Sequence, residues 1–387
     1  MNRTIIVYDP KEVRENLLPI TYTRPVGAIR VGISTMAERW QAFLPGDYAW
    51  STEEYLTELY PSVPATADAL YVAGNVVATH DIALAVNALH PGQVLVHEDM
   101  EIAHCGDVDN YEIVEYRSDV IALKHVYDIF GMTGEVMELD FARITSGRKS
   151  QPVNSTNIIL GDASRIFLEE GASIDASIIN TNQGPVYIGK DATVMEGCRL
   201  RGPVALCEHS VANMGTLIYG ATTLGPWCKV GGEINNIVML GYSNKAHDGF
   251  LGNAVIGEWC NLGADTVASN LKNDYTEIKL WNYHACRFLK TGLQFCGLIM
   301  GDHSKSAIHT SFNTATVVGV GCNIISPGMP RQFIPSFSKG GSAGFENVNL
   351  TEFFAIATRM MARRSIELTD AHRRLFHSIY DFADRFK

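Results

Sequence analysis

The sequence predicts two architectures in one chain, an α/β front domain followed by a parallel β-helix, with α-helices at the C-terminal end. Apolar runs alternate with helix-like segments in the first third of the chain. From about residue 150, apolar residues recur at every sixth position, which is the signature of a parallel β-helix. We therefore divide the chain into a front domain (1–117), a helical linker (118–150), a β-helix (151–345) and C-terminal helices (346–387).

The front domain begins with a short apolar run, residues 4–8, that suits a buried strand and ends at a turn. A strand, turn and helix follow over residues 69–89, and another strand is expected near 94–97. Such alternation is typical of an α/β layer whose site lies at the strand ends. Apolar residues then fall at helical spacing, so we expect a connecting helix over about 118–130.

Arg24 and Arg30 lie six residues apart in a loop with Pro and Gly that leads into a helix-like segment, 34–43. Two guanidinium groups so placed could bind a pyrophosphate bidentately. Spacing alone equally allows two solvated surface arginines.

The β-helix prediction rests on eight apolar residues at unbroken intervals of six, and the fourth residue after most of them is small. Three six-residue units close one triangular coil, and the apolar residue of each unit points into the prism. The eight positions are Ile188, Val194, Leu200, Leu206, Ala212, Ile218, Leu224 and Val230.

The register breaks after Val230 and again over about 273–299, and we expect it to resume at Ile308, Thr314 and Val320. Insertions in solenoids form surface loops, where function is often located. The first break leads into residues 244–253, which carry a histidine among several amides.

The C-terminal segment shows a helix start at Asn349 with Glu352 three residues later, and a second helix is expected around 371–386. We expect these helices to cover the open end of the coil or to pack on a neighbouring subunit.

Composition narrows the class of partner. The formal charge of −11 argues against non-specific nucleic-acid binding, which needs a basic surface. The first residues lack the pattern of a signal peptide, and no window has the length of an apolar membrane span. Eight scattered cysteines form no C-x-x-C pair, so we expect a cytoplasmic protein with reduced cysteines and no membrane partner.

The stretch around His247 carries a family resemblance. Lys245-Ala246-His247, Phe250-Leu251-Gly252 and Asn261-Leu262-Gly263-Ala264 resemble the acetyltransferase half of the bacterial bifunctional N-acetylglucosamine-1-phosphate uridyltransferase/glucosamine-1-phosphate acetyltransferase. Longer phrases resemble the Bacteroidetes-type single-chain sugar nucleotidyltransferase family, among them GYSNKAHDGFLGN, SNLKNDY and LLPITYTRPVGAIRVG. The resemblance covers nearly the whole chain and implies a left-handed β-helix behind a nucleotidyltransferase-like front domain.

The resemblance also implies roles for single residues. His247 corresponds to the general base that takes a proton from the attacking amine, and Asn270 to the amide that orients it or the acetyl group. Asn261 corresponds to a sugar-site residue. Lys245, Lys272 and Lys279 are our candidates for the cationic ligands of the sugar phosphate, Arg24 and Arg30 for the triphosphate, and Ala264, Thr266 and Ser306 for acetyl-CoA.

The chain departs from the family pattern at several points. Phe250 replaces a tyrosine, which removes a hydroxyl, and the glycines of the phosphate loop are missing although Thr23-Arg24 is present. Where the family has a Gly-Asp that holds Mg²⁺, this chain has Gly74-Asn75. Asn75 is therefore the candidate Mg²⁺ ligand, and its neutral amide would bind Mg²⁺ more weakly than a carboxylate.

The implied function is synthesis of UDP-N-acetylglucosamine from glucosamine 1-phosphate, acetyl-CoA and UTP with Mg²⁺, by a homotrimer. The partners are then a sugar 1-phosphate, a nucleoside triphosphate and acetyl-CoA. Three alternatives remain open: an acetyltransferase whose front domain only binds nucleotide, a transferase for another sugar nucleotide, and a non-enzymatic β-helix scaffold.

Two further histidines, His303 and His309, lie near Asp302 and could suggest a metal. They lack a zinc-site spacing, so we favour a cofactor-facing or interface role for them.

Overall fold

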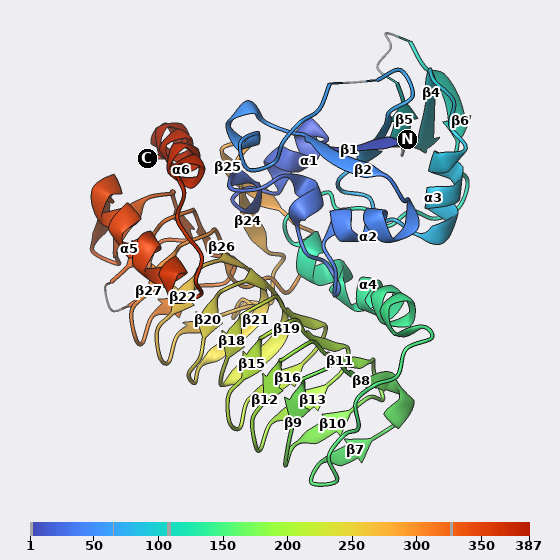
Figure 1. Cartoon of the computed structure of the whole chain (residues 1–387). Coiled ribbons are helices and arrows are strands. Elements are labelled where there is room, and N and C mark those ends of the chain that lie inside the picture. The colour runs from blue at the N-terminus through green and yellow to red at the C-terminus, as the bar shows by residue number, and fades with distance from the viewer. Residues whose placement is uncertain (1–2, 65, 107–109, 326–327) are drawn as a thin grey trace.

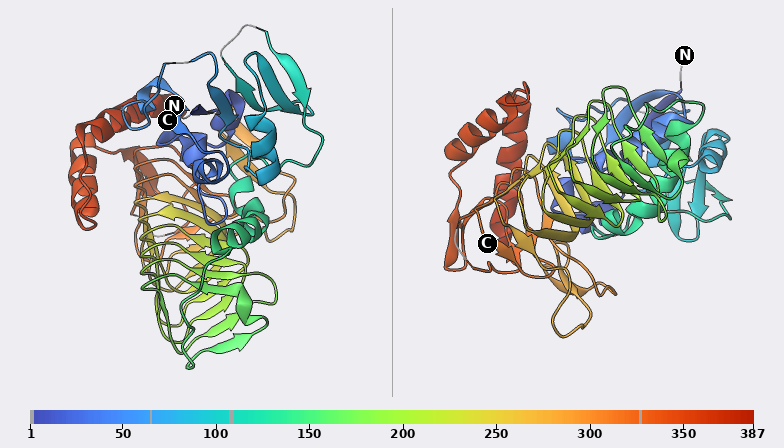
Figure 2. Two further views of the ribbon diagram at one scale, coloured as in Figure 1. Left: turned by 45° about the vertical axis from the view of Figure 1, so that its right-hand side comes forward. Right: turned by 90° about the horizontal axis from the view of Figure 1, so that it is seen from below.

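The computed structural model describes residues 3–64, 66–106, 110–325 and 328–387. It contains an α/β front domain, a long left-handed parallel β-helix and two C-terminal helices (Figure 1). The views in Figure 2 place the front domain and the C-terminal helices at the same end of the β-helix, away from its first strand. Among the described residues, no helix combines the length and apolarity that crossing a bilayer requires.

The front domain is built on a six-stranded sheet of order β2-β1-β3-β5-β4-β6. β1 pairs in parallel with β2 and β3, while β5 runs antiparallel to β3 and β4. The three strands predicted from sequence are confirmed as β1, β3 and β4. The elements are β1 (Thr4–Tyr8), α1 (Lys11–Asn16), α2 (Met36–Phe43), β2 (Asp47–Ser51), β3 (Leu70–Ala73), α3 (His80–Asn87), β4 (Gln93–His97), β5 (Met100–Cys105) and β6 (Glu112–Glu115).

The connecting helix lies later than its apolar spacing predicted. Residues 118–127 form no helix, and α4 runs over Asp128–Thr145. Leu123 and Val126 are 0% and 3% exposed, although they lie in no helix. Next to them, Ala122 forms an isolated β-bridge with Val76. The apolar spacing of this segment therefore reflects burial against neighbouring elements and not a helix. α4 packs along β17, β19 and β21 of the β-helix and connects the two domains.

Each coil of the β-helix contributes a strand to three faces, which we name A, B and C in chain order. β19 and β21 turn the corner from face A to face B without a break. Face A holds β7 (Ile158–Leu160), β10 (Ile178–Asn180), β13 (Arg199–Arg201), β16 (Leu217–Tyr219), the first parts of β19 (Glu233–Gly241) and β21 (Phe250–Glu258), β23 (Val267–Ala268) and β28 (Ser311–Phe312).

Faces B and C complete the prism. Face B holds β8 (Ile166–Leu168), β11 (Val186–Ile188), β14 (Val204–Leu206), β17 (Thr222–Leu224), the ends of β19 and β21, β26 (Ile299–Met300), β29 (Val317–Val318) and β31 (Phe333–Ile334). Face C holds β9 (Ser173–Ile174), β12 (Thr193–Val194), β15 (Val211–Ala212), β18 (Lys229–Val230), β20 (Asn244–Lys245), β22 (Asn261–Leu262), β27 (Lys305–Ser306), β30 (Asn323–Ile324) and β32 (Ser338–Gly341), to which β33 (Gly344–Asn347) pairs antiparallel.

The six-residue repeat is confirmed. All eight predicted positions from Ile188 to Val230 lie in these strands and are at most 2% exposed. The predicted resumption at Ile308 is wrong, because Ile308 is 64% exposed at a corner and the inward residues are Ser306 and Phe312. The inserted hairpin of residues 271–297 shifts the register, so counting in sixes across it fails.

That insertion projects from the corner between faces A and B as an antiparallel pair, β24 (Lys279–Asn282) and β25 (Arg287–Lys290). The chain ends in α5 (Leu350–Ala362) and α6 (Asp370–Ala383). The Asn349 side chain caps α5 by accepting from the backbone N–H groups of Thr351 and Glu352. This is one half of the capping box that the spacing of Asn349 and Glu352 predicts, and within the described residues no return bond joins the Glu352 side chain to the Asn349 N–H.

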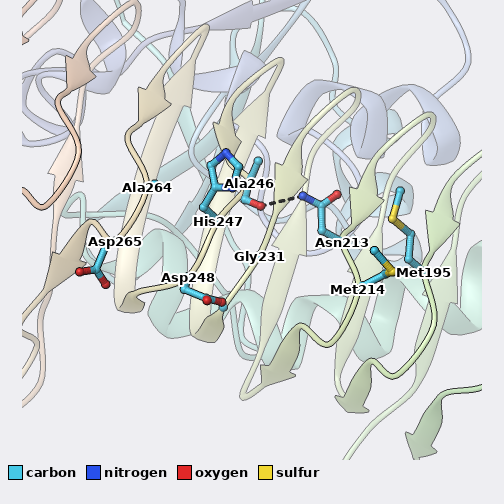
Figure 3. A pocket seen from close by; sticks show the side chains of 10 residues that line it. Met195, Asn213, Met214, Gly231, Ala246, His247, Asp248, Ala264 and Asp265 are labelled. Carbon is cyan, nitrogen blue, oxygen red and sulfur yellow. Dashed lines mark hydrogen bonds between the residues drawn. The ribbon is translucent and has the colours of Figure 1, made fainter.

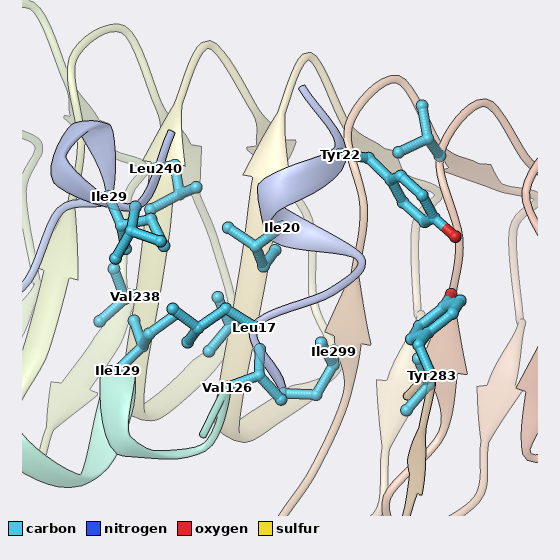
Figure 4. Close-up of a cluster of buried hydrophobic side chains, with 14 of the residues drawn as sticks. Leu17, Ile20, Tyr22, Ile29, Val126, Ile129, Val238, Leu240, Tyr283 and Ile299 are labelled. Atoms are coloured by element: carbon cyan, nitrogen blue, oxygen red, sulfur yellow. The ribbon is translucent and has the colours of Figure 1, made fainter. Parts of the chain in front are cut away.

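One hydrophobic core joins the front domain to face B. The loop after α1 buries Leu17, Ile20 and Ile29 against Val238 and Ile299 of the β-helix (Figure 4). Because this core is continuous, the described structure holds the two domains together by burial and not only by a tether.

Candidate functional site

An open groove runs along the corner between faces C and A, with a volume of about 690 Å³ (Figure 3). The corners of five successive coils contribute to it. Its lining residues are Met195, Asn213, Met214, Gly231, Gly232, Ala246, His247, Asp248, Ala264 and Asp265.

His247 stands exposed on this corner. No hydrogen bond or ion pair engages its imidazole within the described part of the chain, so both ring nitrogens are open to a ligand. Asp248 and Asp265 line the same groove, and the Asp265 carboxylate lies 2.7 Å from His309 Nδ1. The Asn213 amide donates to the Ala246 carbonyl at 2.7 Å and fixes the backbone just before the histidine.

Lys245, two residues earlier, is only 1% exposed and points into the prism at a position where Val230 lies one coil before. Burial lowers the pKa of Lys245 to about 8, against the opposing charges of Asp248 and Asp265. Its Nζ donates to the carbonyl oxygens of Gly231 (3.1 Å), His247 (2.7 Å) and Asp248 (3.0 Å). The ammonium therefore holds the corner that carries His247 and is not exposed to a sugar phosphate, contrary to the role predicted for it.

The three residues predicted for acetyl-CoA separate in the structure. Ala264 lines the groove beside His247. Thr266 and Ser306 are 1% and 6% exposed, and their hydroxyls lie 3.1 Å apart inside the coil. Those two hydroxyls stabilise the corner from within and do not line the groove.

Asn270 lies on a different corner, between faces A and B, where its amide donates to Asn253 Oδ1 at 2.8 Å. The chain thus does not bring Asn270 next to His247. Lys272 and Lys279 belong to the inserted hairpin of that same corner, and Lys272 donates to Thr276. Asn261 is exposed on face C, beyond the corner groove.

The front domain has its own cavity, of about 970 Å³, at the ends of β1 and β3 and beside the β4–β5 hairpin. Asn75 lines it, is 2% exposed, and donates from Nδ2 to the Leu123 carbonyl at 2.9 Å, while its Oδ1 has no partner among the residues that the structure describes. Burial alone would raise the pKa of Glu101 in this cavity, but hydrogen bonds from His104 and Tyr8 outweigh it and lower that pKa.

The residues that line the front-domain cavity do not form a ligand set for Mg²⁺. Within the described residues, no three His, Cys, Asp or Glu side chains come together to hold a metal. Two of the cavity's carboxylates already accept hydrogen bonds, Glu101 from Tyr8 and Asp128 from the backbone of Lys124 and His125. Asn75 offers one buried amide oxygen, so we derive no step through Mg²⁺.

The two loop arginines lie at the junction of the domains and not in that cavity. Arg24 is 3% exposed and forms a bidentate ion pair with Asp302, at 2.6 and 3.2 Å, and a second contact with Glu258 at 3.2 Å. Arg30 donates to the Ile33 carbonyl and approaches Glu38 at 3.7 Å. The sequence allowed two interpretations of these arginines, solvated surface residues or ligands of a triphosphate. The geometry supports neither, because Arg24 is buried against Asp302 and Arg30 lies near Glu38.

Asp302, His303 and His309 diverge rather than form a metal site. Asp302 pairs with Arg24, and His309 Nδ1 lies 2.7 Å from Asp265 at the corner between faces C and A. His303 is packed edge-on against Phe353 and Phe376 of the C-terminal helices, and burial lowers its pKa well below the usual range. Its place favours the predicted interface role, here within one chain.

Sequence reasoning missed most of the groove around His247. Asn213 and Met214 lie on an earlier coil than His247, and Asp265 lies on the next coil, all at the same corner. The coils differ in length, since Thr193 pairs with Val211 but Val230 pairs with Lys245, so counting back from His247 in units of six does not reach Asn213 or Met214. Nothing in the pattern indicated that Lys245 points inward, because lysine is almost never found at such a position.

Comparisons with known proteins support the resemblance. The family described as sugar nucleotidyl transferase matches residues 5–149. A protein named bifunctional protein GlmU from Methanocaldococcus jannaschii is 31% identical over 90 residues, which is 23% of this chain and 21% of that protein. A bifunctional sugar-1-phosphate nucleotidylyltransferase/acetyltransferase from Sulfurisphaera tokodaii is 28% identical over 139 residues, 35% of this chain and 34% of that one.

The aligned segments thus span a fifth to a third of these relatives. Among solved structures, the polySia-specific acetyltransferase NeuO aligns with a TM-score of 0.28 at 11% identity, over 54% of this chain and 94% of that one. UDP-N-acetylglucosamine acyltransferase from Campylobacter jejuni aligns with a TM-score of 0.26 at 14% identity, over 61% and 95%. Similarities this low carry no functional argument.

Proposed function

We propose, from the premise that residues 5–149 belong to the sugar nucleotidyl transferase family, that this chain is a transferase with two sites. The β-helix transfers an acetyl group from acetyl-CoA to the amine of glucosamine 1-phosphate. The front domain joins the resulting sugar 1-phosphate to a uridylyl group from UTP, so the product is UDP-N-acetylglucosamine.

The exposed imidazole of His247 in the corner groove is the observation that carries the acetyltransferase half. A general base needs a free nitrogen within reach of the substrate, and the exposed imidazole of His247 offers one.

In this reaction the sugar amine attacks the thioester carbonyl carbon, and His247 takes the proton that the amine loses. The C–S bond breaks, and the departing CoA sulfur takes a proton as the amide forms. Lys245 acts as a positioning residue, because its three hydrogen bonds fix the backbone on both sides of the imidazole.

In the front domain, a phosphate oxygen of the sugar 1-phosphate attacks the α-phosphorus of UTP and pyrophosphate leaves. The cavity at the ends of β1 and β3 is the support for this half. Its residues would bind and orient the sugar nucleotide, with the buried Asn75 amide at its floor.

One incubation tests both halves. The protein is mixed with glucosamine 1-phosphate, acetyl-CoA and UTP with Mg²⁺, and free thiol and pyrophosphate are followed separately. We expect both products. Thiol without pyrophosphate, for every NTP tried, identifies an acetyltransferase whose front domain only binds nucleotide.

Other outcomes separate the remaining alternatives. Turnover with a different amino sugar phosphate in a substrate panel identifies another sugar nucleotide as the product. If acetyl-CoA neither binds nor is consumed and His247→Ala changes nothing, the β-helix is a scaffold.

We also propose that the chain works as a homotrimer. A sedimentation experiment at micromolar concentration would give three times the mass of 42.5 kDa, and a monomer would refute this assembly.

A further inference from the structure

A second groove lies between α5 and face C, with a volume of about 340 Å³. Its floor is formed by Asn244 and Asn261, which point outward from neighbouring strands β20 and β22. Its wall is one side of α5, because Ile356, Arg359, Met360 and Arg363 follow the spacing i, i+3, i+4 and i+7. Figure 1 shows α5 beside β22 and β27 at this end of the β-helix.

Four cationic side chains converge on this groove: Lys305, Arg359, Arg363 and Arg364. Within the residues that the structure describes, none of them forms an ion pair with a carboxylate. Glu258, the acid that starts the same corner, is already engaged by Arg24. The chain as a whole carries a formal charge of −11, whereas this groove is locally positive.

The side chain of Lys305 lines the groove and is held in place by a hydrogen bond. Its Nζ donates to the backbone carbonyl of His303 at 2.8 Å. Burial lowers the pKa of Lys305 to about 8. A bound anion would reverse that effect and keep the ammonium charged.

Aromatic rings border the same groove. Tyr242 and Trp259 stack with their centroids 4.2 Å apart and their planes 7° apart. They occupy equivalent corner positions on successive coils, each with a positive φ, of 55° and 59°. One coil earlier Trp227 takes the same conformation, and the Arg364 guanidinium lies over its ring at 5.0 Å.

We propose that this groove binds a nucleoside diphosphate, that is, a diphosphate ester that carries a flat heterocyclic base. The three arginines and Lys305 would neutralise the phosphates, as guanidinium groups do bidentately. The base would lie against the partly exposed ring of Tyr242, which the buried Trp259 supports from behind, and the amides of Asn244 and Asn261 would donate to its edge or to the sugar. The volume suits a ligand of this size, since small-molecule pockets span roughly 300–1,000 Å³.

Two sources offer this chemistry, the ADP portion of a coenzyme A thioester and a free nucleotide. The groove would bind either whether or not the chain performs the two transfers proposed above, so the test measures binding without turnover. Titration calorimetry of the full chain uses CoA, ADP and inorganic pyrophosphate as probes, at low and at raised salt.

The decisive variant is Arg359→Ala/Arg363→Ala, because both side chains are exposed on α5 and their removal should not disturb the fold. The matched control is Arg199→Ala/Arg201→Ala, which removes the same charge from exposed positions on face A. We expect the α5 variant to weaken ADP or CoA binding at least tenfold and to reduce its salt dependence, and the control to bind like the wild type.

A second variant, Tyr242→Leu, separates base stacking from charge. It should weaken ADP binding and leave pyrophosphate binding unchanged, with folding checked by its melting temperature. Tighter binding of CoA than of ADP would name the coenzyme as the source, and equal binding of both would name a free nucleotide moiety. The proposal is overturned if no probe binds saturably up to millimolar concentration, or if the α5 variant binds as tightly as the wild type.

Discussion

The β-helix and the front domain place their charged residues by different means. In the β-helix, register alone separates Lys245, buried inside the prism, from His247, exposed two residues later. In the front domain, Arg24 and Arg39 are buried by tertiary contacts with Asp302 and Asp140, which lie far away in the sequence. Counting in sixes reveals the direction of a side chain where the repeat is unbroken, as from Ile188 to Val230. Lys245 lies beyond the break in that repeat, so its direction, like that of Arg24, is known only from the folded structure.

The largest expected effect isolates the β-helix site. His247→Asn should lower acetyl transfer by about 10²–10⁴-fold, because the amide cannot take up the proton. Pyrophosphate release by the front domain should stay unchanged when the acetylated sugar 1-phosphate is supplied directly with UTP. Initial rates are therefore measured in two separate assays, thiol formation from glucosamine 1-phosphate and acetyl-CoA, and pyrophosphate formation from N-acetylglucosamine 1-phosphate and UTP.

The same substitution at His90, an exposed residue of the front domain, serves as the control. It should leave both rates at the wild-type level. A loss of pyrophosphate formation for His247→Asn even when N-acetylglucosamine 1-phosphate is supplied would show that the two sites are not independent.

The next effect concerns how the domains are joined. Asp302→Ala should lower the free energy of unfolding by about 3–5 kcal/mol, because it leaves the Arg24 guanidinium buried without its main partner. Urea unfolding followed by circular dichroism gives this value. Glu58→Ala is the comparison, since it removes the exposed pair with Arg374 and should change the free energy of unfolding far less than Asp302→Ala does.

A smaller effect tests the inward lysine through pH. The pKa of Lys245 is about 8 in the folded chain and near 10.5 when unfolded. Between these values the unfolded chain holds a proton that the folded chain has lost, so unfolding free energy should rise with pH. Lys245→Met should remove about 1–3 kcal/mol of that rise between pH 8 and 10.

Lys305 has the same lowered pKa and remains in that variant, so part of the rise should persist. Parallel pH curves for wild type and Lys245→Met would mean that the buried lysine keeps an ordinary pKa.

The smallest effect concerns the inserted hairpin. Lys272→Ala/Lys279→Ala should change the free energy of unfolding by no more than about 0.5 kcal/mol, because neither side chain is buried. If these lysines bind the sugar phosphate, as the resemblance implies, KM for the sugar acceptor should rise severalfold at constant kcat. An unchanged KM would contradict that role.

Much of the fold was predictable because it repeats. The positions from Ile188 to Val230 each occupy the same place in a six-residue unit, and all are buried as predicted. The prediction failed at Ile308, just after an insertion whose length is unrelated to the repeat. The connecting helix was misplaced because Leu123 and Val126 are buried by neighbouring elements and not by a helix of their own.

The candidate sites were predictable only in part. His247 was found because it stands in a motif on an exposed corner, and the structure gives it a groove. The places of Asn270, Thr266 and Arg24 depend on which corner or domain each one faces, and a linear motif does not record that. The cations of α5 escaped notice because they meet face C from nearly a hundred residues further along the chain.

The contact of Arg24 with both Glu258 and Asp302 also limits how many coils can separate these two residues. These two residues lie on successive coils, where the Glu258 N–H donates to Asp302 Oδ1 at 2.9 Å and Arg24 contacts both carboxylates. Coils stack about 4.8 Å apart, so one extra coil between these residues would move Asp302 out of reach of a guanidinium that still held Glu258. The number of coils beneath the front domain is therefore fixed by the reach of one arginine side chain.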